Sequence, residues 1–174
     1  MRICAKFSSW IHNLFISSLL IILGCSTAPI LKMPKSLPPI VKEYKHITFS
    51  GNQPGMVKTG VHLNEGDTYS ILATGSIDLG PKGGSPNNVV KPEQGRLLLR
   101  IGSNHGAFHP LNNSNGLTVK AFVSGGLYLG LRDGFVDNYG NPSNPEWYYN
   151  NVGAFNVDII IWKEDDYSQI AAFF

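Results

Sequence analysis

The feature that most constrains the fold is a succession of short alternating or β-branched segments from about residue 43 onward. Clusters of Gly, Asn, Asp and Pro separate them, and no segment shows sustained helical periodicity. Alternation places every second side chain on one face of a strand, and such clusters favour turns. Strands are expected over residues 44–49, 56–63, 68–76, 96–101, 117–123, 126–132 and 154–162. This pattern predicts an all-β domain, a single antiparallel sandwich of the jelly-roll kind.

The last of these segments also indicates sheet order. Residues 154–162 begin with alternation and end with consecutive apolar side chains, as expected for a central strand. The tail that follows mixes acidic residues with a final Ala-Ala-Phe-Phe and predicts no particular element.

The first 24 residues have the parts of a bacterial export signal. Arg2 and Lys6 are positive, residues 14–23 are mostly apolar, and Gly24 precedes Cys25. The apolar run is too short to span a bilayer, which takes about 20 apolar residues as a helix. Residues 22–25, Ile-Leu-Gly-Cys, resemble the bacterial lipobox, in which the Cys is acylated and becomes the mature N-terminus. An ordinary signal peptide that contains a Cys, or an uncleaved anchor, is the alternative.

The lipobox resemblance implies a bacterial envelope lipoprotein held in the membrane by lipid on Cys25, palmitate being one such acyl chain. Several chains on one residue make attachment durable. Ser26 stands where an acidic residue often retains lipoproteins at the inner membrane, so the outer membrane is expected. The prolines that follow favour an extended tether. The expected plan is a signal peptide (1–24), a Pro-rich tether (25–43), a sandwich domain (44–163) and a tail (164–174).

Composition argues against several function classes. The chain has 14 Lys and Arg against 12 Asp and Glu, and Arg2 and Lys6 leave with the signal. The mature chain is therefore neutral, which gives no support for a nucleic-acid partner. Cys4 and Cys25 are the two cysteines, so the folded part has no disulfide and no cysteine metal site.

Signatures of catalysis are missing from the sequence, and no enzyme is expected. The nucleophile motif Gly-x-Ser-x-Gly does not occur. His105 and His109 lie in a Gly- and Pro-containing loop, whereas a zinc-binding pair at this spacing lies on a helix. Asp133 and Asp137 are a carboxylate pair of the kind used in glycoside hydrolysis, but nothing in the sequence predicts a deep cleft around them.

Oxygen-bearing side chains gather where two strands end and begin. Asp133 closes one expected strand, and Asn150 and Asn151 open the next. Carboxylate, amide and carbonyl oxygens are the ligands of a hard cation such as calcium. An ion in an exposed loop also leaves positions for sugar hydroxyls. The alternative is that the Asn pair is turn chemistry, with Gly153 supplying unusual dihedrals.

Four stretches, taken in order, resemble the PA-IL family of calcium-dependent, galactose-binding bacterial lectins, which are small β-sandwiches. The resemblance extends over about residues 54–162. The stretches are residues 59–77, Leu79-Gly-Pro81, Lys91-Pro-Glu-Gln-Gly95 before residues 98–102, and Asp133 with residues 150–155.

The resemblance implies a calcium site and a sugar site that share residues. Calcium would be held by the side chains of Asp133, Asn150 and Asn151 and by the backbone carbonyls of Leu79 and Trp147. Two ring hydroxyls of galactose would lie on the ion, hydrogen-bonded by Asp133 and Asn150.

The sugar site also includes a turn, and the chain departs from the family nearby. Gln94 matches a Gln that contacts the exocyclic hydroxyl, and Lys91 stands at the position of a His that contacts the sugar. A loop that follows the Gln in the family is missing here. The segment between Asp133 and Asn150 is longer than in the family, and its Asp137 would replace Asp133 as ligand if the register slips.

These observations predict a tethered, non-enzymatic carbohydrate-binding module whose glycan ligand is galactoside-like. The alternative is a structural or assembly lipoprotein of the envelope that keeps the sandwich, lacks a sugar site and binds a protein partner. The longer segment between Asp133 and Asn150 is called the inserted loop below. Residues 147–149, Trp-Tyr-Tyr, either offer a stacking face for a sugar or pack this loop.

Overall fold

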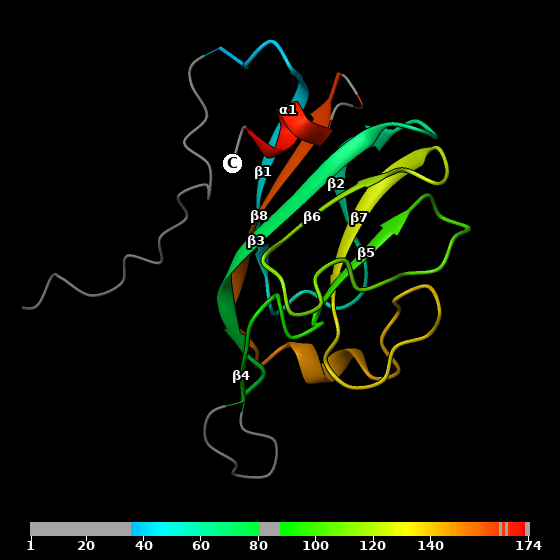
Figure 1. Ribbon diagram of the computed structural model, residues 1–174. Helices are drawn as coiled ribbons and strands as arrows, with labels where there is room; N and C mark the ends of the chain where they lie inside the picture. Colours follow the sequence, from blue (N-terminus) through cyan, green and yellow to red (C-terminus); the bar gives the residue numbers. More distant parts are fainter. Residues whose placement is uncertain (1–35, 81–87, 164, 166, 173–174) are drawn as a thin grey trace, which may run out of the picture.

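The computed structural model describes residues 36–80, 88–163, 165 and 167–172, and it confirms the antiparallel β-sandwich. Two sheets lie face to face (Figure 1). The larger has the order β1 (Val41–Ser50), β8 (Val152–Trp162), β3 (Thr68–Asp78), β4 (Val89–Val90), with β6 (Gly116–Lys120) also paired to β3. The smaller has the order β2 (Val57–Leu63), β7 (Gly125–Leu131), β5 (Leu97–Ile101). All described strand pairs are antiparallel.

Each of the seven predicted strands corresponds to an observed one, with ends shifted by a few residues. The largest shift at an N-terminal end is in β1, which begins at Val41 rather than at residue 44. Val41 is buried, and the N–H of Lys163 donates to the carbonyl of Ile40 at 2.9 Å. Three short elements were not predicted: β4, the 3-10 helix η1 (Pro145–Tyr148) and the helix α1 (Tyr167–Ala171).

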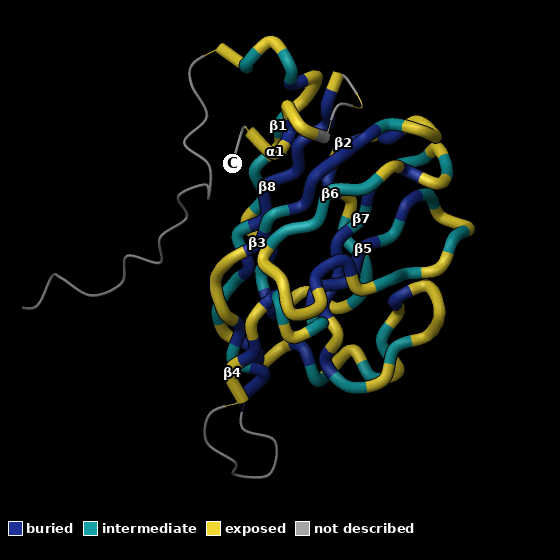
Figure 2. Tube along the Cα trace, viewed as in Figure 1, coloured by how far each residue is buried: buried dark blue, intermediate teal, exposed yellow. Residues whose placement is uncertain are grey.

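The core lies between the two sheets and is filled by alternate side chains of both (Figure 2). The strand β8 contributes Phe155, Val157, Ile159 and Ile161 to it. The facing strands β5 and β7 contribute Leu97, Leu99, Ile101, Leu127, Leu129 and Leu131. Because β8 pairs with β1 on one side and with β3 on the other, its predicted central position is confirmed.

A second apolar cluster covers the outer face of β8. Ile160 and Trp162 pack there with Val41 of β1 and with Ile170 of α1. The Trp162 indole N–H donates to the Ser70 hydroxyl at 2.8 Å, which satisfies its one polar group. The last residues of β8 are therefore apolar on both faces because the sandwich packs on one side and α1 on the other.

The two ends of the sandwich differ. In Figure 1, α1 and the first described residues lie at one end, and η1 with the loop before it lies at the opposite end. The predicted signal peptide, Cys25 and most of the predicted tether lie outside the described residues. Among the described helices, none has the length and apolar character needed to cross a membrane.

We expect Ile170→Ala to lower the free energy of unfolding by about 2 kcal/mol, because it leaves a cavity against Trp162. Urea denaturation followed by tryptophan fluorescence measures the change. Ala171→Ser, at an exposed position of the same helix, is the control and should leave the midpoint unchanged. Equal midpoints for Ile170→Ala and the unchanged protein would show that α1 does not contribute to the stability of the fold.

Candidate functional site

A buried tyrosine fixes the loops at the η1 end of the sandwich. Asn144 caps η1 by accepting a hydrogen bond from the N–H of Glu146, and the turn directs Tyr148 into the core, where it is fully buried. Its hydroxyl donates to the carbonyl of Leu131 at 2.8 Å and accepts the N–H of Asp133 at 3.1 Å. The end of β7 and the approach to β8 are therefore tied together, which positions Asp133.

Asp133 and Asn151 form a buried polar pair. The Asn151 side-chain nitrogen donates to Asp133 Oδ2 at 3.0 Å and to the carbonyl of Gly51 at 3.1 Å. Both partners are acceptors, so the amide nitrogen must face them, and the position of the amide oxygen is thereby fixed. That oxygen, Asn151 Oδ1, is buried and has no hydrogen-bond partner among the described residues. A buried acceptor of this kind requires an explanation.

Two glycines allow the side chains of the remaining predicted ligand residues to pack closely on the backbone. A Cβ on Gly80 would lie 2.5 Å from Asn150 Nδ2, so Asn150 packs directly on the backbone next to Leu79. A Cβ on Gly134 would lie 2.4 Å from Trp147 Cζ3, so the indole packs on the backbone next to Asp133. The absence of a side chain at both glycines is thus required for these contacts.

The structure therefore brings the five predicted calcium ligands to one end of the sandwich. The oxygens there include a carboxylate, two amide groups and nearby backbone carbonyls, which suit a hard cation. Among the described residues, no three His, Cys, Asp or Glu side chains form a group that could hold a metal ion. A cation at this end would depend on one carboxylate supplemented by neutral oxygens.

The alternative ligand Asp137 organises its own loop. Its carboxylate accepts hydrogen bonds from the backbone N–H groups of Tyr139 and Asn141 and from the Asn141 side chain, each at 2.8 Å. These bonds, that of the Asn141 side chain first, lower the pKa of Asp137. The structure thus pairs Asp133, rather than Asp137, with Asn151.

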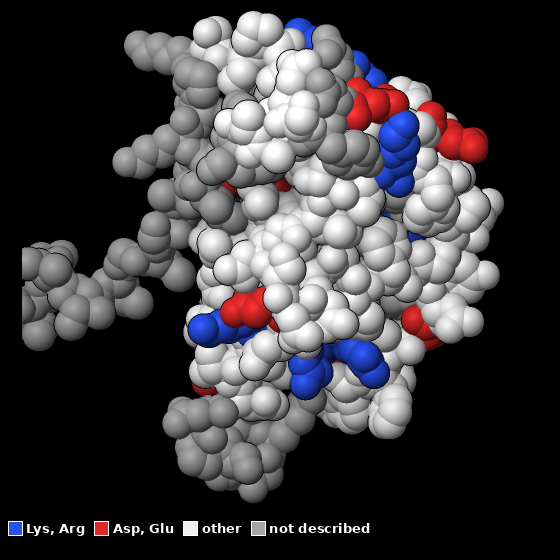
Figure 3. Space-filling view, in the orientation of Figure 1, with Lys and Arg blue, Asp and Glu red and all other residues white. Residues whose placement is uncertain are grey.

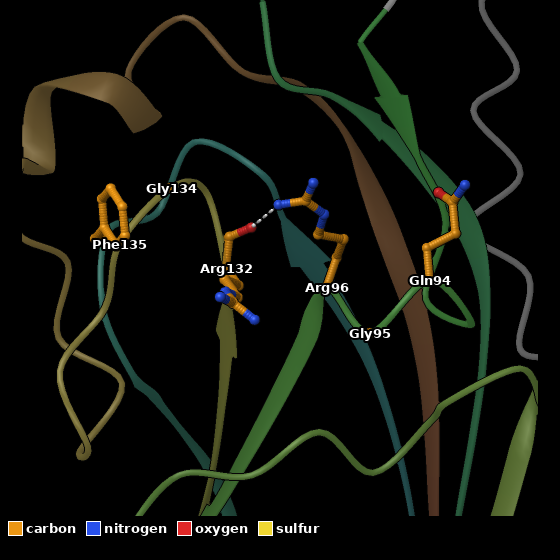
Figure 4. A pocket seen from close by; sticks show the side chains of 6 residues that line it. All are labelled: Gln94, Gly95, Arg96, Arg132, Gly134 and Phe135. Carbon is orange, nitrogen blue, oxygen red and sulfur yellow. Dashed lines mark hydrogen bonds between the residues drawn. The ribbon is translucent and has the colours of Figure 1, made fainter.

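Gln94 lies in a tight turn that opens into a pocket. Its side-chain oxygen accepts the N–H of Lys91 at 2.7 Å, and Gly95 closes the turn with a φ of 67°. The pocket has a volume of about 420 Å³ and is shown in Figure 4; it is lined by Gln94, Gly95, Arg96, Arg132, Gly134 and Phe135. Because Gly134 follows Asp133, the pocket opens beside the Asp133–Asn151 pair. The Lys91 side chain is exposed and does not line this pocket, so its role as a sugar contact stays a prediction.

The aromatic residues 147–149 differ in burial, which separates the two roles expected for them, packing and sugar stacking. Tyr148 is in the core and Trp147 is half-buried against it, so two of the three pack the inserted loop. Tyr149 is 67% exposed. Phe135, which the sequence reasoning did not single out, is 78% exposed on the pocket wall. Tyr149 and Phe135 are therefore exposed rings, and of the two Phe135 lines the pocket.

The sequence did not predict which groups support and surround the predicted ligands. The Tyr148 hydroxyl and the Gly51 carbonyl hold Asp133 and Asn151, and Arg96 with Arg132 lines the pocket. Arg132 was detectable as the neighbour of Asp133. No sequence signal marks Gly51, because its carbonyl is brought to the site by the sandwich alone.

Comparisons with known proteins support the fold. No protein-family model and no curated protein matches the chain. A solved structure described as "EclA N-terminal domain; PllA-like lectin" is 20% identical and aligns over 67% of this chain and 95% of its own, with a TM-score of 0.52. At this identity the similarity shows a lectin-like fold.

His109 lies beside the pocket and next to one of its arginines. His109 Nε2 is 3.5 Å from Arg132 Nη1. Partial desolvation of the imidazole, and then the positive charges of Arg132 and Arg96, lower the pKa of His109 below its usual value of 6.5. The neutral imidazole is thus favoured in the folded state.

We expect the free energy of unfolding to fall as the pH drops through the unfolded-state pKa of His109, about 6.5. Below that value the unfolded chain binds the proton more readily than the folded one, so protonation favours unfolding. Urea midpoints at about pH 7.5 and about pH 5.5 measure the loss, and His109→Gln should show a smaller loss over the same interval. An equal loss in the variant would contradict this assignment.

Proposed function

We propose that this chain is a lipid-anchored glycan-binding module of the bacterial cell envelope that captures sugar hydroxyls through a bound calcium ion. The observation that carries the proposal is the buried Asn151 oxygen, which has no described partner and lies on the amide that contacts the buried Asp133 carboxylate. A cation would satisfy this oxygen. The lectin-like fold supports the glycan as ligand.

The residues present fit calcium. Asp133 would contribute its carboxylate, Asn150 and Asn151 their amide oxygens, and Leu79 and Trp147 their backbone carbonyls. Calcium takes six to eight oxygen ligands in flexible geometry, so these groups leave positions for others. With one carboxylate in the set, we expect weak affinity, in line with the dependence of calcium affinity on ligand charge.

The chain's own residues would hold the sugar against the ion. When bound, calcium supplies a Lewis acid that accepts two hydroxyl oxygens. Asp133 and Asn150 would hydrogen-bond the same hydroxyls, and Gln94 would contact the exocyclic group from the neighbouring pocket. Tyr149 and Phe135 are exposed aromatic rings on which an apolar sugar face can pack. Such binding breaks no covalent bond, and a galactoside is the ligand that the resemblance implies.

The placement of the site suits display from a membrane. The described chain enters β1 at the end of the sandwich that carries α1, whereas η1 and the candidate site lie at the other end (Figure 1). A module attached through lipid on Cys25 and a Pro-rich tether would therefore present its loops away from the attachment point. We place it at the outer membrane because Ser26 follows Cys25.

Calcium should raise the melting temperature of the protein. At a concentration about 100 times the dissociation constant, binding to the folded state stabilises by about 2.7 kcal/mol. For a domain of this size this corresponds to a rise of about 5–15 °C. Differential scanning fluorimetry with CaCl₂ or EGTA measures it, and Asp133→Asn, which removes the charge but keeps the shape, should abolish the rise.

Asp137→Asn is the matched control, because it removes an exposed carboxylate of the inserted loop and leaves an oxygen to accept the loop N–H groups. It should respond to calcium like the unchanged protein. Loss of the calcium response in Asp137→Asn but not in Asp133→Asn would indicate that calcium binds in the inserted loop instead. No response in any protein would contradict the calcium site.

Binding to immobilised galactosides should require calcium. We expect retention on a galactoside surface in CaCl₂, release by EGTA, and at least a tenfold loss of affinity in Asp133→Asn, the effect of about 1.4 kcal/mol or more. Surface plasmon resonance on a glycan array measures these affinities. A calcium response without retention of any glycan would favour the alternative, an assembly lipoprotein with a structural ion.

A further inference from the structure

Two arginines occupy opposite register positions at the ends of neighbouring strands beside the pocket. Arg96 precedes β5 and Arg132 follows β7, and they continue the register in which Leu97 pairs with Leu131. The N–H of Arg132 donates to the carbonyl of Arg96 at 2.8 Å. In return, Arg96 Nη1 donates to the carbonyl of Arg132 at 3.2 Å (Figure 4). The first bond joins the two backbones, and the second holds the Arg96 side chain against the Arg132 carbonyl. The Arg132 guanidinium points in a different direction from that of Arg96 (Figure 4).

This pairing is unfavourable without a ligand. Like charges directly opposite each other on neighbouring strands destabilise a sheet. Within the described part of the chain, neither arginine has an acidic group within 4.0 Å. The buried carboxylate of the neighbouring Asp133 is paired with Asn151, and Glu93 lies in the turn before Arg96. Figure 3 shows Lys and Arg side chains at the lower end of the visible face, where Figure 1 places η1, and also at its upper right, with Asp and Glu side chains near both groups.

The pocket also has the other properties of a saccharide subsite. Its volume of about 420 Å³ is in the range of small-molecule pockets. Phe135, 78% exposed, supplies an apolar face, and Gln94 supplies an amide. Each guanidinium carries five N–H donors, and one bond to a described protein acceptor is accounted for in Arg96, so donors remain for a ligand. Arginine binds planar carboxylates and other oxyanions especially well.

We infer that this pocket selects glycans that carry an acidic group, with Arg96 and Arg132 binding the carboxylate or sulfate of a sugar held at the adjacent Asp133–Asn151 site. The inference rests on the proposed function, because it assigns a substrate class to the same site. Phe135 packs on the ring of the acidic sugar, and Gln94 lines the same pocket.

Isothermal titration calorimetry with three matched ligands tests the inference. They are methyl galactoside, the galacturonide that differs from it by a carboxylate, and the 6-sulfated galactoside. In CaCl₂ at low salt we expect at least one acidic ligand to bind roughly five- to tenfold more tightly than the neutral one, as charge-assisted hydrogen bonds in a partly exposed site provide. The two acidic ligands show which anion the pocket prefers.

Arg132→Gln should bring the ratio of acidic to neutral affinity close to one. Lys45→Gln is the matched control, since it removes one exposed positive charge from β1, outside the pocket, and should keep the ratio. Raising the ionic strength from about 0.01 M to about 1 M shortens the Debye length from about 30 Å to about 3 Å and should reduce the ratio in the unchanged protein. A ratio of one in the unchanged protein, or a ratio unaffected by Arg132→Gln, would overturn the inference.

A second readout reports on the pocket itself. Because Arg132 lowers the pKa of His109, an anion bound to Arg132 should raise it. An NMR titration of the His109 imidazole should show a rise with the galacturonide and no change with methyl galactoside. A rise of equal size with the neutral ligand would contradict binding of the acidic group at Arg132.

Failure of the two proposals gives different results. Calcium-dependent binding of all three ligands with equal affinity would overturn the acidic pocket and leave the proposed function intact. Binding of the acidic ligands that persists in EGTA and is lost in Arg132→Gln would support the acidic pocket and contradict the calcium-dependent function. Binding of none of the ligands would overturn both.

Discussion

The candidate site depends on the hydrogen bonds of one buried hydroxyl. Tyr148 is held in the core by the same apolar packing that joins the two sheets, and its hydroxyl links the carbonyl of Leu131 to the N–H of Asp133. Breaking a buried network of this kind leaves polar groups unsatisfied, at about 1–3 kcal/mol for each group. The inserted loop is thereby fixed at its end, and Asp133 is fixed with it. The contact of Asp133 with Asn151 and the shape of the neighbouring pocket follow from that position.

The fold was predictable from the sequence because the order of apolar and polar residues in each strand reflects which of its faces are buried. The alternation in Val57–Leu63 and the apolar end of β8 each reflect which faces are covered, and both were assigned correctly. The elements that were missed are short: β4 has two residues, η1 four and α1 five. The position of each depends on contacts that are distant in sequence, such as that of Ile170 with Trp162, which no local pattern records.

The site was predictable in its residue types and less so in its surroundings. Asp133 and the Asn pair stood out because oxygen-bearing side chains clustered at strand ends. The supporting carbonyl of Gly51 comes from a turn 100 residues before Asn151, and only the sheet register brings the two together. The pairing of Arg96 with Arg132 was not predictable either, because only the pairing of β5 with β7 places them opposite each other. Residues that come together only in the tertiary structure have no characteristic spacing in the sequence, so a sequence pattern does not identify them.

Three unfavourable local features of this molecule lie together at the η1 end. At the α1 end, the outer face of β8 is covered and the Trp162 N–H is satisfied. At the η1 end, Asn151 Oδ1 lacks a described partner, two arginines oppose each other, and Phe135 exposes most of its ring. Each of these features costs stability in the isolated chain, and natural sequences keep such features mainly at functional sites. A cation would relieve the first, an anionic group the second and a sugar ring the third. One ligand, an acidic saccharide bound through calcium, would relieve all three together.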